Sequence, residues 1–142
     1  WETAYYTDFS GSSGKGPRPI VVSYASSPPF EVFFSEGKLA EPPTGVVIGS
    51  GACFRQIEYT GILKGTRNRR LAEKFVDYML SVRFQEDIPL QMYMYPANPA
   101  AKLPEVFVQF AETPRDPATL APEMIQKNRE TWIEKWTEAV LR

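Results

Sequence analysis

The clearest hydrophobic pattern in the chain lies between residues 66 and 80. Apolar side chains recur there at the spacing of one helix face, namely Leu71, Phe75, Val76 and Met79, while the charged side chains lie largely off that face. This pattern predicts an amphipathic helix over Thr66–Leu80.

Four other segments also have helical patterns. Trp1, Tyr5 and Phe9 follow one another at intervals of four residues, which indicates the last turns of a helix. Residues 30–34 are compatible with a short helix or a strand, and we favour a helix, with Ser27 as candidate N-cap and Pro28 at the first helical position. Another short helix is expected at 81–88, ended by Pro89. A long terminal helix is predicted over 119–142, with Thr119 as its cap and apolar residues on one face, namely Ile125, Trp132, Trp136 and Val140.

Three segments are predicted to be strands. The run Ile20–Tyr24 is short, rich in β-branched residues and bounded by turn residues, which is typical of a buried strand. Residues 46–48 and 54–63 are expected to form two more strands, separated by Gly-Ser-Gly. Residues 10–19 are expected to be a Gly/Ser/Pro loop. Because strands and helices are mixed along the chain, the predicted class is α/β.

Composition excludes several kinds of function. The chain has 142 residues, 43% of them hydrophobic, which suits one globular domain with a real core. Its net charge is −1 and its charges are interspersed, so we expect no binding to nucleic acid. It contains no histidine and one cysteine, Cys53, and no standard catalytic signature, which argues against metal binding and against many hydrolase mechanisms.

Two segments carry candidate binding residues. Ser23–Pro28 places Tyr24 at the end of a predicted strand, before a hydroxyl-rich turn, where α/β folds present ligand contacts. The segment 90–104 carries Tyr93 and Tyr95 between prolines, and such rings can stack on a flat or cationic ligand. The alternative for both segments is structural, with the rings packed in the core and the serines forming the turn.

Beyond these patterns, the chain resembles a known family. Seven of its segments resemble, in the same order, segments of the thiamine-binding periplasmic proteins of ABC transporters. Those proteins belong to the type II periplasmic binding protein superfamily. The segments are Ser23–Pro28, 58–65, 71–81, Phe84-Gln85, Ile88-Pro89, 94–98 and 132–136. The resemblance covers nearly the whole chain but only the C-terminal portion of the longer family proteins. We therefore expect the chain to be part of a two-lobed protein.

The resemblance implies a fold and a function. Residues 1–49 are expected to belong mostly to the second lobe, and residues 50–142 to return to the first lobe with C-terminal helices. The implied function is capture of thiamine, or of a phosphorylated or related form, between the lobes for delivery to a membrane ABC permease. The implied location is the periplasmic or extracellular face of a bacterial membrane. No enzymatic activity and no cofactor are implied. Exposed strand edges would also allow exchange of segments between copies.

The same resemblance assigns ligand contacts to five residues. Trp1 matches the family's stacking tryptophan, Tyr24 matches its ligand tyrosine, and Ser27 lies close to the site. Phe30 stands where the family usually has tyrosine, and Tyr93 where it has tryptophan. Both replacements keep a ring for stacking, but they leave the identity of the ligand open.

Two alternatives follow. The same fold would bind another solute, such as a polyamine, a ferric complex or a small organic anion. Alternatively, the scaffold would serve an enzyme with Cys53 as nucleophile, although that cysteine lies outside the matched motifs and has no histidine as a base.

Overall fold

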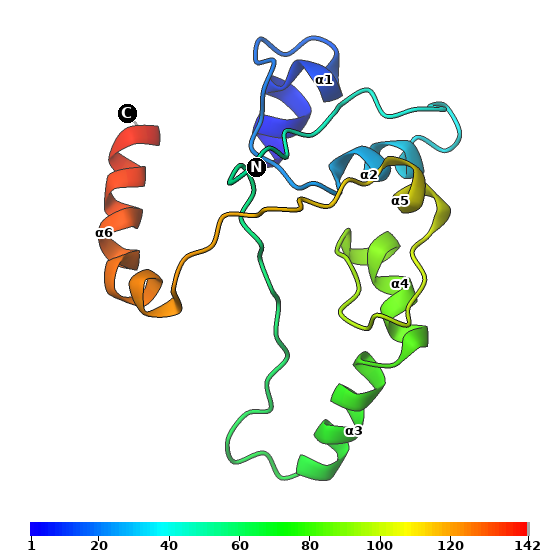
Figure 1. The fold of residues 1–142 in the computed structure, drawn as a ribbon, viewed down its shortest axis with the longest axis vertical. Helices are drawn as coiled ribbons and strands as arrows, with labels where there is room; N and C mark the ends of the chain where they lie inside the picture. The colour runs from blue at the N-terminus through cyan, green and yellow to red at the C-terminus, as the bar shows by residue number, and fades with distance from the viewer. Residues whose placement is uncertain (142) are drawn as a thin grey trace.

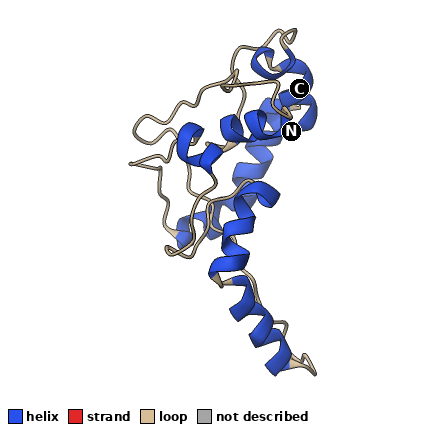
Figure 2. Cartoon of the chain, turned by 90° about the vertical axis from the view of Figure 1, so that its right-hand side faces the viewer, coloured by secondary structure: helices blue, strands red, loops and turns tan. Residues whose placement is uncertain are grey.

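The fold consists of helices joined by long extended segments (Figures 1 and 2). The computed structural model describes residues 1–141, apart from the side chains of Ser12 and Ser13. The elements in chain order are the π-helix η1 (Ala4–Asp8) and the α-helices α1 (Ser10–Ser13), α2 (Ser27–Phe34), α3 (Arg69–Met79), α4 (Val82–Met92), α5 (Glu105–Phe110) and α6 (Pro122–Val140).

The N-terminal helix is confirmed, together with its aromatic face. The ring of Tyr5 lies 4.9 Å from that of Trp1 and 5.7 Å from that of Phe9, measured between centroids. Tyr5 and Phe9 are buried, so this face forms one part of a small core. The expected loop at 10–19 is wrong in its first part, because residues 10–13 form the single turn α1, which packs against η1.

A second part of the core lies between α2 and α5. These helices pack against each other, although the segment 35–104, which includes α3 and α4, separates them in sequence. Phe107 of α5 is only 2% exposed. The helix at 30–34 is confirmed, but it begins earlier than predicted: Ser27 is its first residue and Ser26 is the N-cap, without a side-chain capping bond.

The helices α3 and α4 follow each other directly and pack together. The predicted helix at 66–80 is confirmed, beginning three residues later. Ser81 caps α4 by accepting a hydrogen bond from the backbone N–H of Phe84 at 3.4 Å. The prediction that Pro89 ends this helix is wrong, since α4 continues through Pro89 to Met92.

The expected strands, and with them the expected α/β class, are not found in residues 1–141. Segments 20–24, 46–48 and 54–63 are extended but have no ladder, and strand-like pairing is limited to the isolated bridges Phe9–Arg18 and Phe54–Ala118. A strand requires a hydrogen-bonded neighbour, which the pattern of one segment cannot provide. Side chains on these segments are therefore largely open to solvent, and Val22 is 91% exposed.

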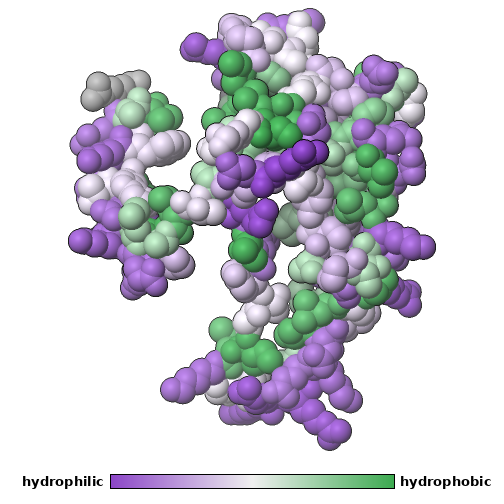
Figure 3. Space-filling view, viewed as in Figure 1, coloured by the Kyte–Doolittle hydropathy of each residue, from purple (hydrophilic) through white to green (hydrophobic). Residues whose placement is uncertain are grey.

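The terminal helix α6 stands apart from the other helices (Figure 1). It begins at Pro122 and has Ala121 as N-cap, so the prediction of Thr119 as cap is wrong. Pro122 and Glu123 lie in its first turn. Its predicted apolar face is uncovered, with Trp136 60% exposed. Figure 3 shows apolar side chains on the surface of this helix and over the main body.

Candidate functional site

The first group of predicted site residues surrounds Trp1. The Trp1 ring stacks on Tyr5, meets Tyr6 edge-on with centroids 5.9 Å apart, and lies 6.4 Å from the ring of Tyr24. Trp1 is 55% exposed and Tyr24 61% exposed. The structure therefore brings two of the predicted contacts together with much of their ring surface free to stack on a ligand.

A second aromatic group joins the C-terminal end of α4 to α2. The ring of Tyr93 meets Phe30 edge-on at 4.4 Å and Phe34 at 5.7 Å. Tyr93 is the C-cap of α4 and has a left-handed backbone, with φ of 58°. The buried hydroxyl of Ser26 donates a hydrogen bond to the Tyr93 carbonyl oxygen at 2.6 Å, which holds this uncommon conformation in place.

Tyr6 connects the two groups. It contacts Trp1 directly. Burial raises the pKa of Tyr6, and electrostatic interaction with the phenol of Tyr93 and with the carboxylates of Glu2 and Glu31 acts in the same direction. We call the set Trp1, Tyr6, Tyr24, Phe30 and Tyr93 the aromatic surface.

Ser27 lies below this surface rather than on it. It is 9% exposed, and its hydroxyl lies 2.8 Å from the hydroxyl of Ser23. The five residues implied by the family resemblance thus occupy one region, in which Trp1 and Tyr24 are exposed, Phe30 and Tyr93 are half-buried and Ser27 is buried. Their role in binding stays a prediction.

Sequence reasoning missed two residues of this region, Tyr6 and Glu31. Tyr6 lies off the face defined by Trp1, Tyr5 and Phe9, so the helical spacing did not single it out. Glu31 is one of many acidic residues, and only the packing of α2 shows its partners.

Glu31 ties three separate segments together. The Tyr5 hydroxyl donates a hydrogen bond to its Oε1 at 2.6 Å, and the Thr44 hydroxyl donates to its Oε2 at 2.5 Å. Burial of the phenol raises the pKa of Tyr5 well above its ordinary value of 10.0, and the hydrogen bond to Glu31 and the charge of that carboxylate act in the same direction. These bonds fix η1 on α2, and so fix Trp1 relative to Phe30.

The raised pKa of Tyr5 predicts a loss of stability in alkaline solution. Above pH 10.0 the phenol ionises in the unfolded chain but not in the folded one, so folding becomes less favourable as the pH rises. For this group alone, the free energy of unfolding should fall by up to about 1.4 kcal/mol per pH unit. Denaturant titrations from neutral to alkaline pH measure this slope. Tyr5→Phe should have a shallower slope, and an unchanged slope would contradict the assignment.

Two features of the described residues concern metal binding and the cysteine. Within residues 1–141, no group of three acidic or cysteine side chains is placed to hold a metal ion. The Cys53 thiol donates to the carbonyl oxygen of Val47 at 3.6 Å, and the sequence has no histidine to serve as its base. No helix in the described part of the chain is long and apolar enough to cross a membrane.

One open groove lies away from the aromatic surface. It is an open groove of about 520 Å³ between residues 60–66 and the side of α3, lined by Phe75 and Val76. No predicted ligand residue contributes to it. The candidate site is thus an open surface of rings rather than an enclosed cavity.

Comparison with known proteins finds similarity along the whole chain. It is 29% identical over 153 aligned residues to the thiamine-binding periplasmic protein of Salmonella typhimurium, 30% over 146 residues to that of Brucella suis, and 29% over 154 residues to that of Escherichia coli. Each match covers 100% of this chain and 40% of the relative, so the chain spans less than half the length of these proteins. No protein-family model matches the chain, and no solved structure matches it significantly.

Proposed function

We propose that this chain, which is homologous over its whole length to thiamine-binding periplasmic proteins, is part of the solute-binding component of an ABC transporter and helps to bind thiamine. The observation that carries the proposal is this full-length homology, and the gathering of Trp1, Tyr24, Phe30 and Tyr93 in one region supports it. The relatives are named as periplasmic proteins, so we propose the periplasm, or the outer face of the membrane, as the location.

The chemistry of the aromatic surface suits such a ligand. Thiamine combines a flat aminopyrimidine with a permanently cationic thiazolium ring. An aromatic face attracts a cation by about 0.5–2 kcal/mol, depending on how far the pair is withdrawn from water. Trp1 and Tyr24 have the exposed ring surface that this interaction requires. Binding by stacking needs no nucleophile and no general base, in keeping with a chain without histidine.

The aromatic surface also fits a site shared between two lobes. In a two-lobed binding protein the ligand lies between two bodies, and each body contributes residues to the site. We propose that residues 1–49 belong mostly to one lobe and residues 50–142 mostly to the other. The aromatic surface draws on both ranges, because the ring of Tyr93 meets that of Phe30.

A ligand panel tests the proposal. Isothermal titration calorimetry of the protein with thiamine, a polyamine, a ferric complex and a small organic anion should give saturable binding for thiamine. Binding of another solute instead would favour the second candidate, a binding protein of the same kind with a different ligand. The observation that favours this second candidate is Phe30, which has no hydroxyl, at a position where the family that the chain resembles usually has tyrosine. Turnover of thiamine, abolished by Cys53→Ala, would instead identify an enzyme.

Removal of one exposed ring should weaken binding measurably. We expect Tyr24→Ala to raise the dissociation constant for thiamine by about 2- to 30-fold, which corresponds to the loss of one cation–ring contact. Tyr59→Ala is the matched control, since Tyr59 is 86% exposed and lies on the extended segment 54–63, outside the aromatic surface. Calorimetry on both variants decides, and equal affinities would exclude Tyr24 from the site.

A further inference from the structure

The carboxylate of Glu31 has a chemical role that stacking alone does not use. Its two oxygens accept hydrogen bonds from the hydroxyls of Tyr5 and Thr44, which hold the group in one orientation. Both donors are neutral hydroxyls, so these bonds orient the negative charge without neutralising it. Glu31 is also half-buried, where a charge acts more strongly than in open water.

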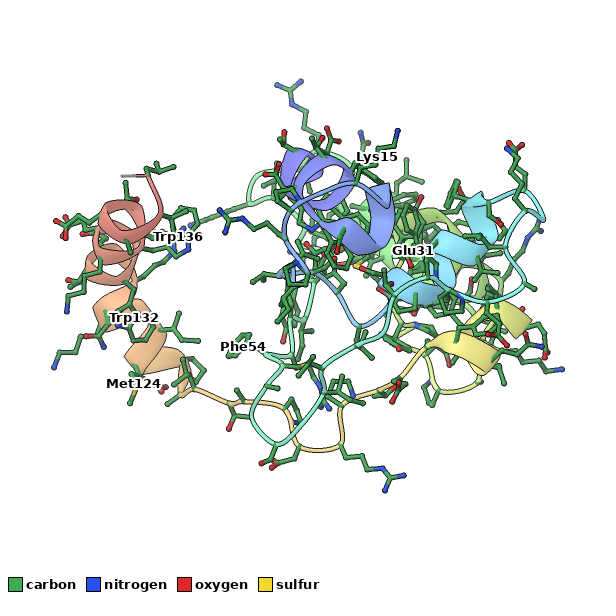
Figure 4. All side chains as sticks on the ribbon, turned by 90° about the horizontal axis from the view of Figure 1, so that it is seen from above. Lys15, Glu31, Phe54, Met124, Trp132 and Trp136 are labelled. Carbon is green, nitrogen blue, oxygen red and sulfur yellow. The ribbon has the colours of Figure 1, made fainter. Side chains whose placement is uncertain are left out.

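This charge lies beside the aromatic surface. Tyr5, which donates to Glu31, stacks directly on Trp1 with ring planes 21° apart. Glu31 follows Phe30 in helix α2, and its charge acts on Tyr6 as well. Figure 4 shows Glu31 in the main body, within the group of side chains from η1 and α2 and far from α6.

We infer that Glu31 is a specificity-determining residue that makes the aromatic surface select cationic ring ligands over neutral rings of the same shape. The inference rests on the proposed function and deepens it. Stacking and burial of apolar area act on neutral and cationic rings alike, and the aromatic faces themselves add only a limited attraction for the cation. A fixed carboxylate next to those faces adds an attraction that only the cation experiences, and it does so without a direct contact.

The inference separates Glu31 from a purely structural residue. If Glu31 only fixed η1 on α2, its replacement would weaken the binding of cationic and neutral ligands equally. If Glu31 selects for positive charge, its replacement weakens the binding of the cationic ligand more than that of the neutral ligand. The ratio of the two affinities therefore reports the electrostatic role, whatever happens to stability.

The test compares thiamine with its thiophene isostere, in which a carbon replaces the thiazolium nitrogen and the positive charge is absent. We expect the wild-type protein to prefer thiamine, and Glu31→Gln to reduce that preference by about tenfold. Affinity for the neutral isostere should change by less than about twofold. Glu31→Asp retains the charge and should retain most of the preference. Thr44→Ala removes one donor but keeps the carboxylate, and should also retain it.

The outcomes are distinct. If the wild-type protein binds both compounds and Glu31→Gln keeps the wild-type ratio, the inference is wrong and the proposed function stands. If the wild-type protein binds neither compound, the proposed function is wrong and the inference falls with it. If Glu31→Gln does not fold, the inference is tested on the wild-type protein by measuring both affinities at low and high ionic strength. The preference for thiamine over the isostere should decrease as ionic strength rises, and a constant preference contradicts the inference.

Discussion

We expect Phe107→Ala to lower the free energy of unfolding by about 3–5 kcal/mol, because it removes a large side chain from the small core and leaves a cavity. Phe107 is 2% exposed, and it belongs to α5, which packs against α2. Its ring also meets that of Tyr95 edge-on at 5.9 Å. The substitution should therefore loosen the support of α2, which carries Phe30 and Glu31.

Urea denaturation followed by circular dichroism measures this effect. Val108→Ala is the matched control, because Val108 is the next residue on the same helix and is 63% exposed. It should change stability by less than about 0.5 kcal/mol. Equal effects of the two substitutions would show that α5 does not pack on α2 through Phe107.

The second large effect is expected at Gln85, whose buried amide connects three segments. The side chain donates a hydrogen bond to the Met79 carbonyl oxygen at 2.7 Å, and its own oxygen accepts from the backbone N–H groups of Ala97 and Asn98 at 2.6 Å and 3.2 Å. Gln85→Ala removes all three bonds and leaves backbone groups without partners. The free energy of unfolding should fall by about 2–4 kcal/mol.

Hydrogen exchange localises the effect of Gln85→Ala. The amides of Ala97 and Asn98 should exchange faster in the variant, because their acceptor is gone. Gln109→Ala provides the control, since Gln109 makes a single exposed bond to Glu105 within α5. Unchanged protection at residues 97 and 98 would mean that Gln85 does not hold this segment.

Helices could be predicted from this sequence because their signal is local. The apolar stripe of residues 71–79 lies within one element, and its spacing alone specifies α3. The same reasoning failed at Pro89, where a residue that usually ends helices lies inside α4. It failed completely for residues 54–63. An extended segment becomes a strand only when it is hydrogen-bonded to a neighbouring strand, and the sequence of the segment does not show whether such a neighbour exists.

The candidate site was only partly predictable, for a related reason. Family resemblance pointed to Trp1, Tyr24 and Tyr93, and the structure brings these rings into one region through contacts between segments far apart in sequence. It did not point to Glu31, whose significance lies in its hydrogen bonds to Tyr5 and Thr44. Contacts of this kind depend on how distant segments pack together, and they produce no periodic pattern in the sequence.

Fluorescence of Trp1 tests the central claim, binding of thiamine at the aromatic surface. The chain has three tryptophans, and Trp132 and Trp136 lie on α6, far from the main body in Figure 4. The double variant Trp132→Phe/Trp136→Phe therefore reports from Trp1 alone. Titration with thiamine should quench its emission saturably, with the dissociation constant of the wild-type protein. A folded double variant that shows no quenching, while the wild-type protein binds thiamine, would place the site elsewhere and contradict this account.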